Sequence, residues 1–369
     1  MLDDSPKPLS SFLILEFVEG RKLDLRKLTE LSEEQQTSLY TSLADIYIQL
    51  RRLEFPSIGC LLSGSDGILV NKKTTSLDIN MQELEGLQPS KIQASYYSAN
   101  GHLISASKYV DMLLEIADNA FAKGRGSVLD EKKGSDALYH LHLFRKFTQG
   151  WVDPSLDQGP FVMVHGDLEP YNLIVDENMS IVSVLDWEWS RIVPRQFFVP
   201  PLWLDVNDTT KLALKPVYGF YLEKFDRLLE IVRNREIERF GEPVLADEWT
   251  AAKHDSGFLV ANALENWTDM DWFAHRYINR QWFPGSDEEE LAARVEAFME
   301  DPAHRALITS KLAEGRAYQA TVERLKRNDA ERLIINRMLS SIPTLSKITW
   351  WGAAALLFAG TCFIRNRMV

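Results

Sequence analysis

Residues 164–172 read VHGDLEPYN, and residues 185–188 read LDWE. The first stretch carries a carboxylate at Asp167 and an amide at Asn172, and the second carries another carboxylate at Asp186. A phosphoryl-transfer site needs a carboxylate that orients and deprotonates a hydroxyl, together with hard oxygen ligands for Mg²⁺ on rigid backbone. These two stretches supply the residue types for such a site if the fold brings them together.

The segments around these stretches predict how they meet. Apolar runs at 161–165, 173–175 and 181–185 indicate short strands, and the sequence DEN at 176–178 is typical of a turn. A hairpin of this kind returns the chain, so Asp186 should arrive beside the preceding polar loop. The pattern therefore predicts that two carboxylates and one amide lie close together.

The motif His-Gly-Asp, four residues and Asn at 165–172, followed by LDWE at 185–188, resembles the aminoglycoside phosphotransferase family, in particular a fungal branch of it. The resemblance implies an α+β, protein-kinase-like fold, mainly the helical C-terminal lobe, with short strands carrying the catalytic and metal loops. It implies ATP as cosubstrate, Mg²⁺ as cofactor and a small-molecule hydroxyl as acceptor. The residues it assigns are Asp167 as catalytic, His165 as structural in the catalytic loop, and Asn172, Asp186 and Glu188 as metal-binding.

The N-terminal stretch is the part in which this family pattern is incomplete. Residues 12–18, FLILEFV, predict a buried strand, and they resemble the hinge between the two lobes. In that comparison the backbone of Glu16, Phe17 and Val18 would meet adenine, and residues 1–24 would be a remnant of the small lobe. The glycine-containing loop and strand lysine that grip the ATP phosphates in the family are not visible in the sequence.

Three explanations of this gap remain open. The sequence may be an incomplete gene model or a fragment of an active kinase, which transfers phosphate from ATP to a hydroxyl of a small polar molecule. Alternatively, the chain has lost catalysis and is a pseudokinase-type binding module, anchored to a membrane by its tail. The third alternative is that it binds nucleotide by another route or borrows the missing lobe.

The rest of the chain is predicted to be largely helical, with residues 25–340 forming the kinase-like C-terminal lobe and extra helices at 286–340. Ser32 should cap a helix whose apolar face runs from Leu39 to Leu53. The other expected segments are a hairpin or loop at 58–71, a polar surface loop at 74–104, helices near 105–122 and 136–149 with a loop at 123–134, and helices at 212–241 and 246–272.

Asp269 and Asp271 form a second acidic feature, in the sequence DMDW. Neighbouring acids on a helix point in different directions, so a solvated helix face is one interpretation. Acidic residues on the late helices of kinases of this shape often line the acceptor pocket, which makes both aspartates substrate-binding candidates in the alternative interpretation.

Charge and hydropathy restrict the partners. The net charge of −12 argues against a nucleic-acid backbone as partner. Residues 348–364, ITWWGAAALLFAGTCFI, contain no charged side chain and approach the length of a membrane span, so 345–366 is expected to be a transmembrane tail. Such a tail would anchor the protein to an intracellular membrane with its folded part facing the cytosol. A buried C-terminal helix is the alternative.

Overall fold

The computed structural model describes residues 16–64, 67–70, 73–99, 101–204 and 209–340. The chain divides into two compact units, Met1–Ala313 and Glu314–Val369. All features of the site belong to the first unit. The described part of the second unit is the continuation of one long helix, α12 (Pro302–Ser340).

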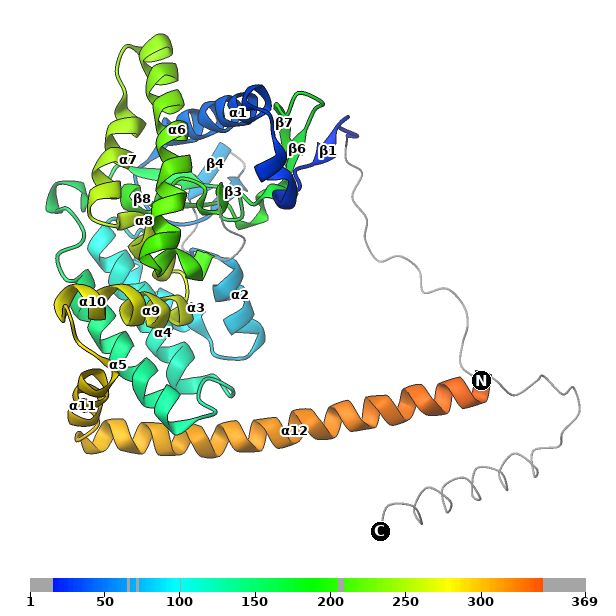
Figure 1. The fold of residues 1–369 in the computed structure, drawn as a ribbon, viewed down its shortest axis with the longest axis vertical. Coiled ribbons are helices and arrows are strands. Elements are labelled where there is room, and N and C mark those ends of the chain that lie inside the picture. The colour runs from blue at the N-terminus through cyan, green and yellow to red at the C-terminus, as the bar shows by residue number, and fades with distance from the viewer. Residues whose placement is uncertain (1–15, 65–66, 71–72, 100, 205–208, 341–369) are drawn as a thin grey trace, which may run out of the picture. The chain divides into compact units, whose positions relative to one another are not determined.

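Short antiparallel strands form the framework of the site. One sheet has the order β1–β6–β7, a second has the order β2–β5–β8, and β3 and β4 form a hairpin (Figure 1). The expected hairpin in 58–71 and the expected strands around the catalytic loop are therefore confirmed. The strands are β1 (Arg21–Lys22), β2 (Glu54–Phe55), β3 (Leu61–Gly64), β4 (Gly67–Val70), β5 (Phe161–Val164), β6 (Leu173–Val175), β7 (Ile181–Val184) and β8 (Arg191–Pro194).

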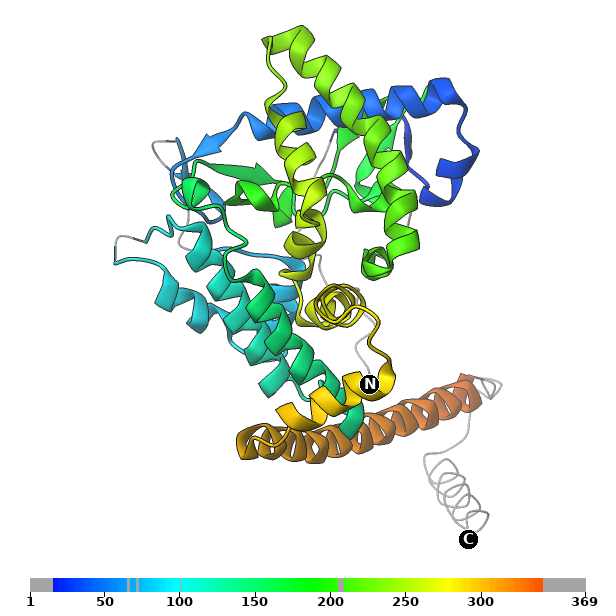
Figure 2. The same ribbon diagram turned by 60° about the vertical axis from the view of Figure 1, so that its left-hand side comes forward.

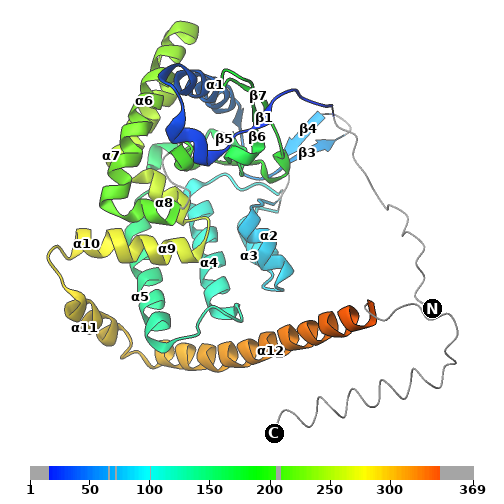
Figure 3. The same cartoon turned by 45° about the vertical axis from the view of Figure 1, so that its right-hand side comes forward.

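Helices surround these strands. Helix α6 packs against both α1 and α7 (Figures 1 and 2), and α9 packs against both α4 and α5 (Figure 3). The helices of the first unit are α1 (Glu33–Arg51), α2 (Leu77–Leu84), α3 (Pro89–Tyr96), α4 (Ala106–Lys123), α5 (Glu131–Thr148), α6 (Lys215–Phe240), α7 (Val244–His254), α8 (Gly257–Ala263), α9 (Trp267–Phe273), α10 (Asn279–Trp282), α11 (Glu288–Phe298) and the start of α12.

Helix α1 forms as its sequence predicts and supports the site from one side. Ser32 and Gln35 make a reciprocal capping box, which satisfies two backbone donors at the start of the helix. Leu39, Leu43 and Leu50 are buried, so the predicted apolar face is in the core up to Leu50. Its predicted last member, Leu53, is wrong, because the helix ends at Arg51 and Leu53 is 48% exposed. Further along, the ring of Tyr47 packs edge-on against the ring of Trp249 from α7. This contact ties α1 to the helical layer behind the site.

The predicted surface loop at 74–104 is wrong, because two short helices lie within it. Ser76 caps α2 by accepting a hydrogen bond from the backbone N–H of Ile79. Pro89 occupies the start of α3, where a missing N–H costs nothing. The predicted loop at 123–134 also ends early, because Asp130 caps α5 and starts that helix at Glu131.

The predicted strand at 12–18 is not found in its described part, because residues 16–18 are irregular and the first strand begins at Arg21. Phe17 is 86% exposed, so the apolar run does not enter a sheet here. The chain joins β6 only where Gly20, at φ +135°, passes close to the carbonyl of Val175. The hinge role of residues 16–18 stays a prediction.

Residues 341–369 lie outside the described residues, and with them the predicted membrane segment at 348–364. Among the helices that the structure does describe, none is both long and apolar enough to cross a membrane. The proposed division into residues 1–24, 25–340 and 345–366 also stays a prediction.

Candidate active site

The carboxylate of Asp167 is held at both of its oxygens. The side-chain nitrogen Nδ2 of Asn172 donates to Oδ2 of Asp167 at 2.9 Å and to its backbone carbonyl at 2.9 Å. The hydroxyl of Tyr171 donates to Oδ1 at 2.8 Å. Asn172 is buried while Asp167 is partly exposed, so a fixed amide orients an accessible carboxylate. The predicted meeting of Asp167 and Asn172 is thus observed.

His165 connects the catalytic loop to the strand that follows it. Its Nδ1 lies 3.3 Å from the backbone N–H of Asp167, and its Nε2 lies 2.8 Å from the carbonyl of Leu185. Nδ1 must accept from the N–H of Asp167, and Nε2 must donate to the carbonyl of Leu185. The ring is therefore the neutral tautomer protonated at Nε2. Burial lowers the pKa of His165, which favours the same state. Both ring nitrogens of His165 thus join the catalytic loop to Leu185, and its structural role stays a prediction.

Gly166 is required by the close approach of two loops. Its φ is +84°, in the left-handed region that glycine adopts most easily. A Cβ at this position would lie 2.1 Å from the carbonyl oxygen of Trp189 and 2.7 Å from Nη1 of Arg191. The catalytic loop can therefore pass over the 187–191 segment only without a side chain here.

Asp186 follows β7 and lies in a left-handed turn, with φ 61° and ψ 58°. The backbone N–H of Leu185 donates to the carbonyl of Asn172 at 2.8 Å, which fixes this turn beside the catalytic loop. Asp186 and Glu188 are both exposed. The hairpin thus returns the chain as predicted and presents two acids to solvent next to Asn172.

The residues on this side of the loop fit a hard divalent cation. Asn172 uses its amide nitrogen on Asp167, which leaves Oδ1 as the ligand atom, and Asp186 offers an exposed carboxylate. No cluster of three or more His, Cys, Asp or Glu side chains suited to a metal occurs among the described residues. An Asn–Asp pair matches Mg²⁺, which keeps several waters or phosphate oxygens and takes few protein ligands.

A pocket of about 250 Å³ opens on the other side of Asp167. Asp167 lines it, whereas Asn172 and Asp186 do not. The walls come from two stretches of chain and two helices: residues 164–169, residues 197–203, Tyr47 and Leu50 of α1, and Asn262 of α8. Asp167 therefore stands between the exposed acids and this half-open pocket.

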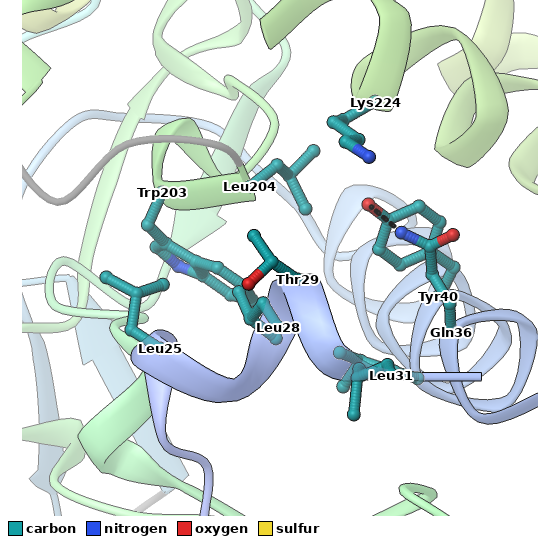
Figure 4. Close-up of a pocket in the computed structure, with 10 residues that line it drawn as sticks. Leu25, Leu28, Thr29, Leu31, Gln36, Tyr40, Trp203, Leu204 and Lys224 are labelled. Atoms are coloured by element: carbon teal, nitrogen blue, oxygen red, sulfur yellow. Dashed lines mark hydrogen bonds between the residues drawn. The ribbon is translucent and has the colours of Figure 1, made fainter. Parts of the chain in front are cut away.

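Two indole N–H groups fix the wall formed by residues 197–203. Trp203 donates to the carbonyl of Leu168 at 2.7 Å, and Trp249 donates to the carbonyl of Phe198 at 2.7 Å. The indole of Trp203 also borders a second cavity of about 50 Å³, with Leu28 beside the indole and Tyr40 farther from it (Figure 4). That second cavity is too small for more than a few water-sized groups. Trp203 thus separates the larger pocket from the packed interior behind it.

Glu169 is a further acid in the larger pocket. No motif or spacing in the sequence indicated a functional role for it. Burial, with the nearby charge of Asp167, raises the pKa of Glu169 to about 7. Within the described part of the chain, no hydrogen bond or ion pair engages its side chain. In the sequence, Glu169 occupies one of the four variable positions between Asp167 and Asn172. Its position at the pocket is evident only from the fold.

The two late aspartates lie elsewhere in the first unit. Oδ1 of Asp271 is 2.7 Å from Nδ1 of His140, a buried residue of α5. The interpretation that Asp271 lies on a purely solvated helix face is therefore wrong, because its carboxylate is hydrogen-bonded to a residue of another helix. Neither Asp269 nor Asp271 is among the residues that line the pocket beside Asp167. Their role in substrate binding stays a prediction.

Three known proteins are similar to parts of this chain. The chain is 32% identical over 114 residues to clavilactone A biosynthesis cluster protein Y of Ampulloclitocybe clavipes, a match spanning 29% of this chain and 28% of that protein. Among solved structures it is similar to ADP-bound aminoglycoside phosphotransferase APH(2'')-Ib, at 16% identity and TM-score 0.29 over 81% of this chain and 71% of that one. It is similar to the gentamicin complex of APH(2'')-IIa at 14% identity and TM-score 0.28, over 70% and 71% of the two chains.

The family model described as phosphotransferase enzyme family matches residues 3–197, more than half of the chain. The match includes the loop from His165 to Asn172 and the turn at Asp186, which have the geometry described above. It confirms the α+β, protein-kinase-like fold expected from the sequence. The chain therefore belongs to the phosphotransferase enzyme family.

Proposed function

We propose that this protein transfers the γ-phosphoryl group of ATP to a hydroxyl of a small molecule in a Mg²⁺-dependent reaction. One observation carries the proposal: the carboxylate of Asp167, oriented by Asn172 and Tyr171, stands between the metal-type ligands and a half-open pocket. This placement is what a base needs if it is to reach a bound hydroxyl on one side and a phosphoryl donor on the other.

In the proposed reaction, Asp167 accepts the proton of the acceptor hydroxyl. The hydroxyl oxygen forms a bond to the γ-phosphorus, the bond from that phosphorus to the β–γ bridging oxygen breaks, and ADP leaves with the electron pair. Asn172 and Asp186, with Glu188 nearby, would hold Mg²⁺, which when bound neutralises charge on the phosphates. His165 and Gly166 keep the loop in the geometry that presents Asp167.

A small molecule as acceptor is supported by the size of the pocket, about 250 Å³. Binding sites for drug-sized ligands occupy roughly 300–1,000 Å³, so this one suits a compact molecule rather than a protein segment. The name of the similar fungal protein, which refers to a biosynthesis cluster, supports the same choice.

Calorimetric titration of the full-length chain with Mg·ATP tests the proposal. We expect wild type to bind with a dissociation constant on the order of micromolar to millimolar, and to lose binding when Mg²⁺ is chelated. Asp186→Ala should lose the Mg²⁺-dependent part, because an exposed carboxylate ligand is removed. Glu177→Ala, at an exposed position of the neighbouring turn, should bind like wild type. A folded wild type that binds no Mg·ATP would overturn the proposal and favour a binding module without catalysis.

A further inference from the structure

We infer that the acceptor is a hydroxyl compound with a compact apolar body and no acidic group, whose second donor group, an amine or a hydroxyl, hydrogen-bonds to Glu169. This inference rests on the proposed function, because it identifies the pocket beside Asp167 as the acceptor site. It adds the chemical class of the acceptor and assigns Glu169 as the residue that determines specificity.

The position of the pocket distinguishes the acceptor side from the nucleotide side. Of Asp167, Asn172 and Asp186, only Asp167 lines the pocket, and the two metal-type ligands lie outside it. A phosphate chain bound to a metal must be near Asn172 and Asp186. The space that reaches Asp167 but neither ligand is therefore left for the hydroxyl compound.

The apolar surface of the pocket is somewhat larger than its polar surface, to which Tyr47, His165 and Asn262 contribute besides the two acids. Residues 197–203 contribute Phe-Phe-Val-Pro-Pro-Leu-Trp, and Leu50, Val164 and Leu168 complete the apolar surface. A sugar or polyamine would place many polar groups against this surface without hydrogen bonds, at a cost for each of them. The volume of about 250 Å³ leaves space for an apolar body of about one or two rings.

The pocket is built before any ligand arrives. The hydrogen bonds from Trp203 and Trp249 hold its wall at both ends, and Pro200 and Pro201 restrict the backbone between them. A wall fixed in this way loses little conformational entropy on binding. Its shape is therefore able to select an acceptor rather than adapt to many.

The charges in the pocket are negative. Asp167 and Glu169 are its acids, and no lysine or arginine is among its lining residues. Arg51 and Arg195, on flanking segments, are bonded to Glu248 at 2.6 and 3.1 Å. An acceptor with a carboxylate or phosphate would face two acids without a counter-charge, whereas an amine or hydroxyl could donate to Glu169.

Glu169 is available for such a contact. Its side chain is partly exposed and lines the pocket two residues from Asp167. In the described part of the chain no hydrogen bond or ion pair engages its carboxylate, which borders the pocket. A ligand donor would give this carboxylate the partner that it lacks, which makes Glu169 a contact residue for the acceptor's second polar group.

Three probes test the inference by calorimetry on the full-length chain. Tyramine has a ring, a hydroxyl and an amine; 4-hydroxyphenylacetate has the same ring and hydroxyl with a carboxylate; kanamycin is polar and polycationic. We expect tyramine to bind in the millimolar range or more tightly, as is usual for about ten non-hydrogen atoms. It should be preferred over 4-hydroxyphenylacetate by at least about tenfold, and kanamycin should not bind in the pocket.

Two variants and a control complete the test. Glu169→Gln keeps the shape and removes the charge, and it should reduce the preference for tyramine about tenfold. Val199→Phe fills part of the pocket and should weaken tyramine binding by at least about tenfold. Glu177→Gln, on the exposed turn between β6 and β7, should behave like wild type. Circular dichroism would establish that each variant is folded.

Several results would overturn the inference. They are equal or tighter binding of 4-hydroxyphenylacetate or kanamycin, no tyramine binding to folded wild type, or an unchanged preference in Glu169→Gln. The Mg·ATP titration is a separate measurement. Tyramine binding with no Mg·ATP binding would therefore refute phosphoryl transfer, and Mg·ATP binding with no tyramine binding would refute the acceptor class alone.

Discussion

The two sides of Asp167 differ in both chemistry and construction. On one side Asn172 lies beside the exposed acids Asp186 and Glu188, and all three come from the single stretch 172–188. On the other side the pocket is half open and more apolar, and its walls come from α1, α8 and residues 197–203 as well as the catalytic loop.

This difference indicates how the two parts of the function are encoded. The polar side needs fixed residue types at fixed spacing, because metal and phosphate chemistry allow few substitutes. The pocket needs only a shape and a pattern of polarity, which many combinations of side chains from distant segments can provide. The residues proposed for phosphoryl transfer therefore lie close together in the sequence. The proposed specificity for the acceptor depends instead on segments that only the tertiary fold brings together.

The largest effect is expected from Asp167→Asn, because this residue belongs to both sides. The substitution keeps the shape and removes the proton acceptor, so Mg²⁺-dependent ADP release with tyramine should fall by about 10²–10⁴-fold. The affinity for Mg·ATP should persist, because Asn172 and Asp186 remain. A coupled assay for ADP measures the first quantity, and calorimetry measures the second. If turnover survived in the variant, Asp167 would not be the base.

Gly166→Ala should disturb both sides through the backbone. The clash with the carbonyl of Trp189, added to left-handed strain, should lower the free energy of unfolding by about 2–4 kcal/mol. Gly150→Ala is the matched control, because Gly150 has φ +81° but no heavy atom within 4 Å of the added Cβ. That control should cost only about 1 kcal/mol. Urea denaturation compares the two, and equal losses would show that the loops can move apart.

His165→Ala should loosen the polar side more than the pocket. It removes an acceptor from the N–H of Asp167 and a donor from the carbonyl of Leu185, and should cost about 1–3 kcal/mol. His165→Gln retains a donor able to reach Leu185 and should recover part of the loss. Denaturant titration measures stability, and the Mg·ATP affinity should fall in the same order. A fully stable alanine variant would contradict the role of His165 as a connection.

A smaller effect, confined to the pocket, is expected from pH. Folding raises the pKa of Glu169 from 4.5 to about 7, so between these values the folded state holds a proton that the unfolded state has lost. The free energy of unfolding therefore decreases as pH rises through this range. Among the described residues, Asp167, Tyr47 and Tyr171 are the titratable groups that interact with Glu169.

Comparison of wild type with Glu169→Gln at about pH 5 and about pH 8 isolates this contribution. Wild type should lose stability relative to the variant as pH rises. The opposite contribution of His165, whose lowered pKa gives stability that is present above its unfolded pKa and lost as pH falls, is common to both proteins and cancels. A difference that does not change with pH would mean that Glu169 is not buried as described.

The sequence predicted the polar side well because its determinants are local. The strands around the loop, the turn at 176–178 and the capping of α1 by Ser32 are all found. The pocket could not be predicted, because nothing in residues 197–203 indicates that Trp203 will bond to the carbonyl of Leu168. Tyr171 was missed as a partner of Asp167 for the same reason: its role depends on a side-chain direction.

The errors have physical causes too. The helices α2 and α3 were overlooked because their polar composition concealed two starting signals, the Ser76 cap and Pro89. At residues 16–18, the described part of the run, hydrophobicity alone predicted a strand, yet a strand also needs a partner, and Phe17 is in solvent. The bond between Asp271 and His140 joins residues 131 positions apart, beyond the reach of any local pattern.

The left-handed backbone at Asp186 determines which amino acids selection for stability alone would favour at this position. Residues other than glycine adopt this conformation at an energetic cost, and among side chains asparagine tolerates it best. A library screened for thermal resistance alone should therefore accept glycine or asparagine at this position. A library screened for nucleotide binding should recover aspartate. The amino acid that each screen enriches at this one position would show whether ease of folding or ligand capture determines the residue there.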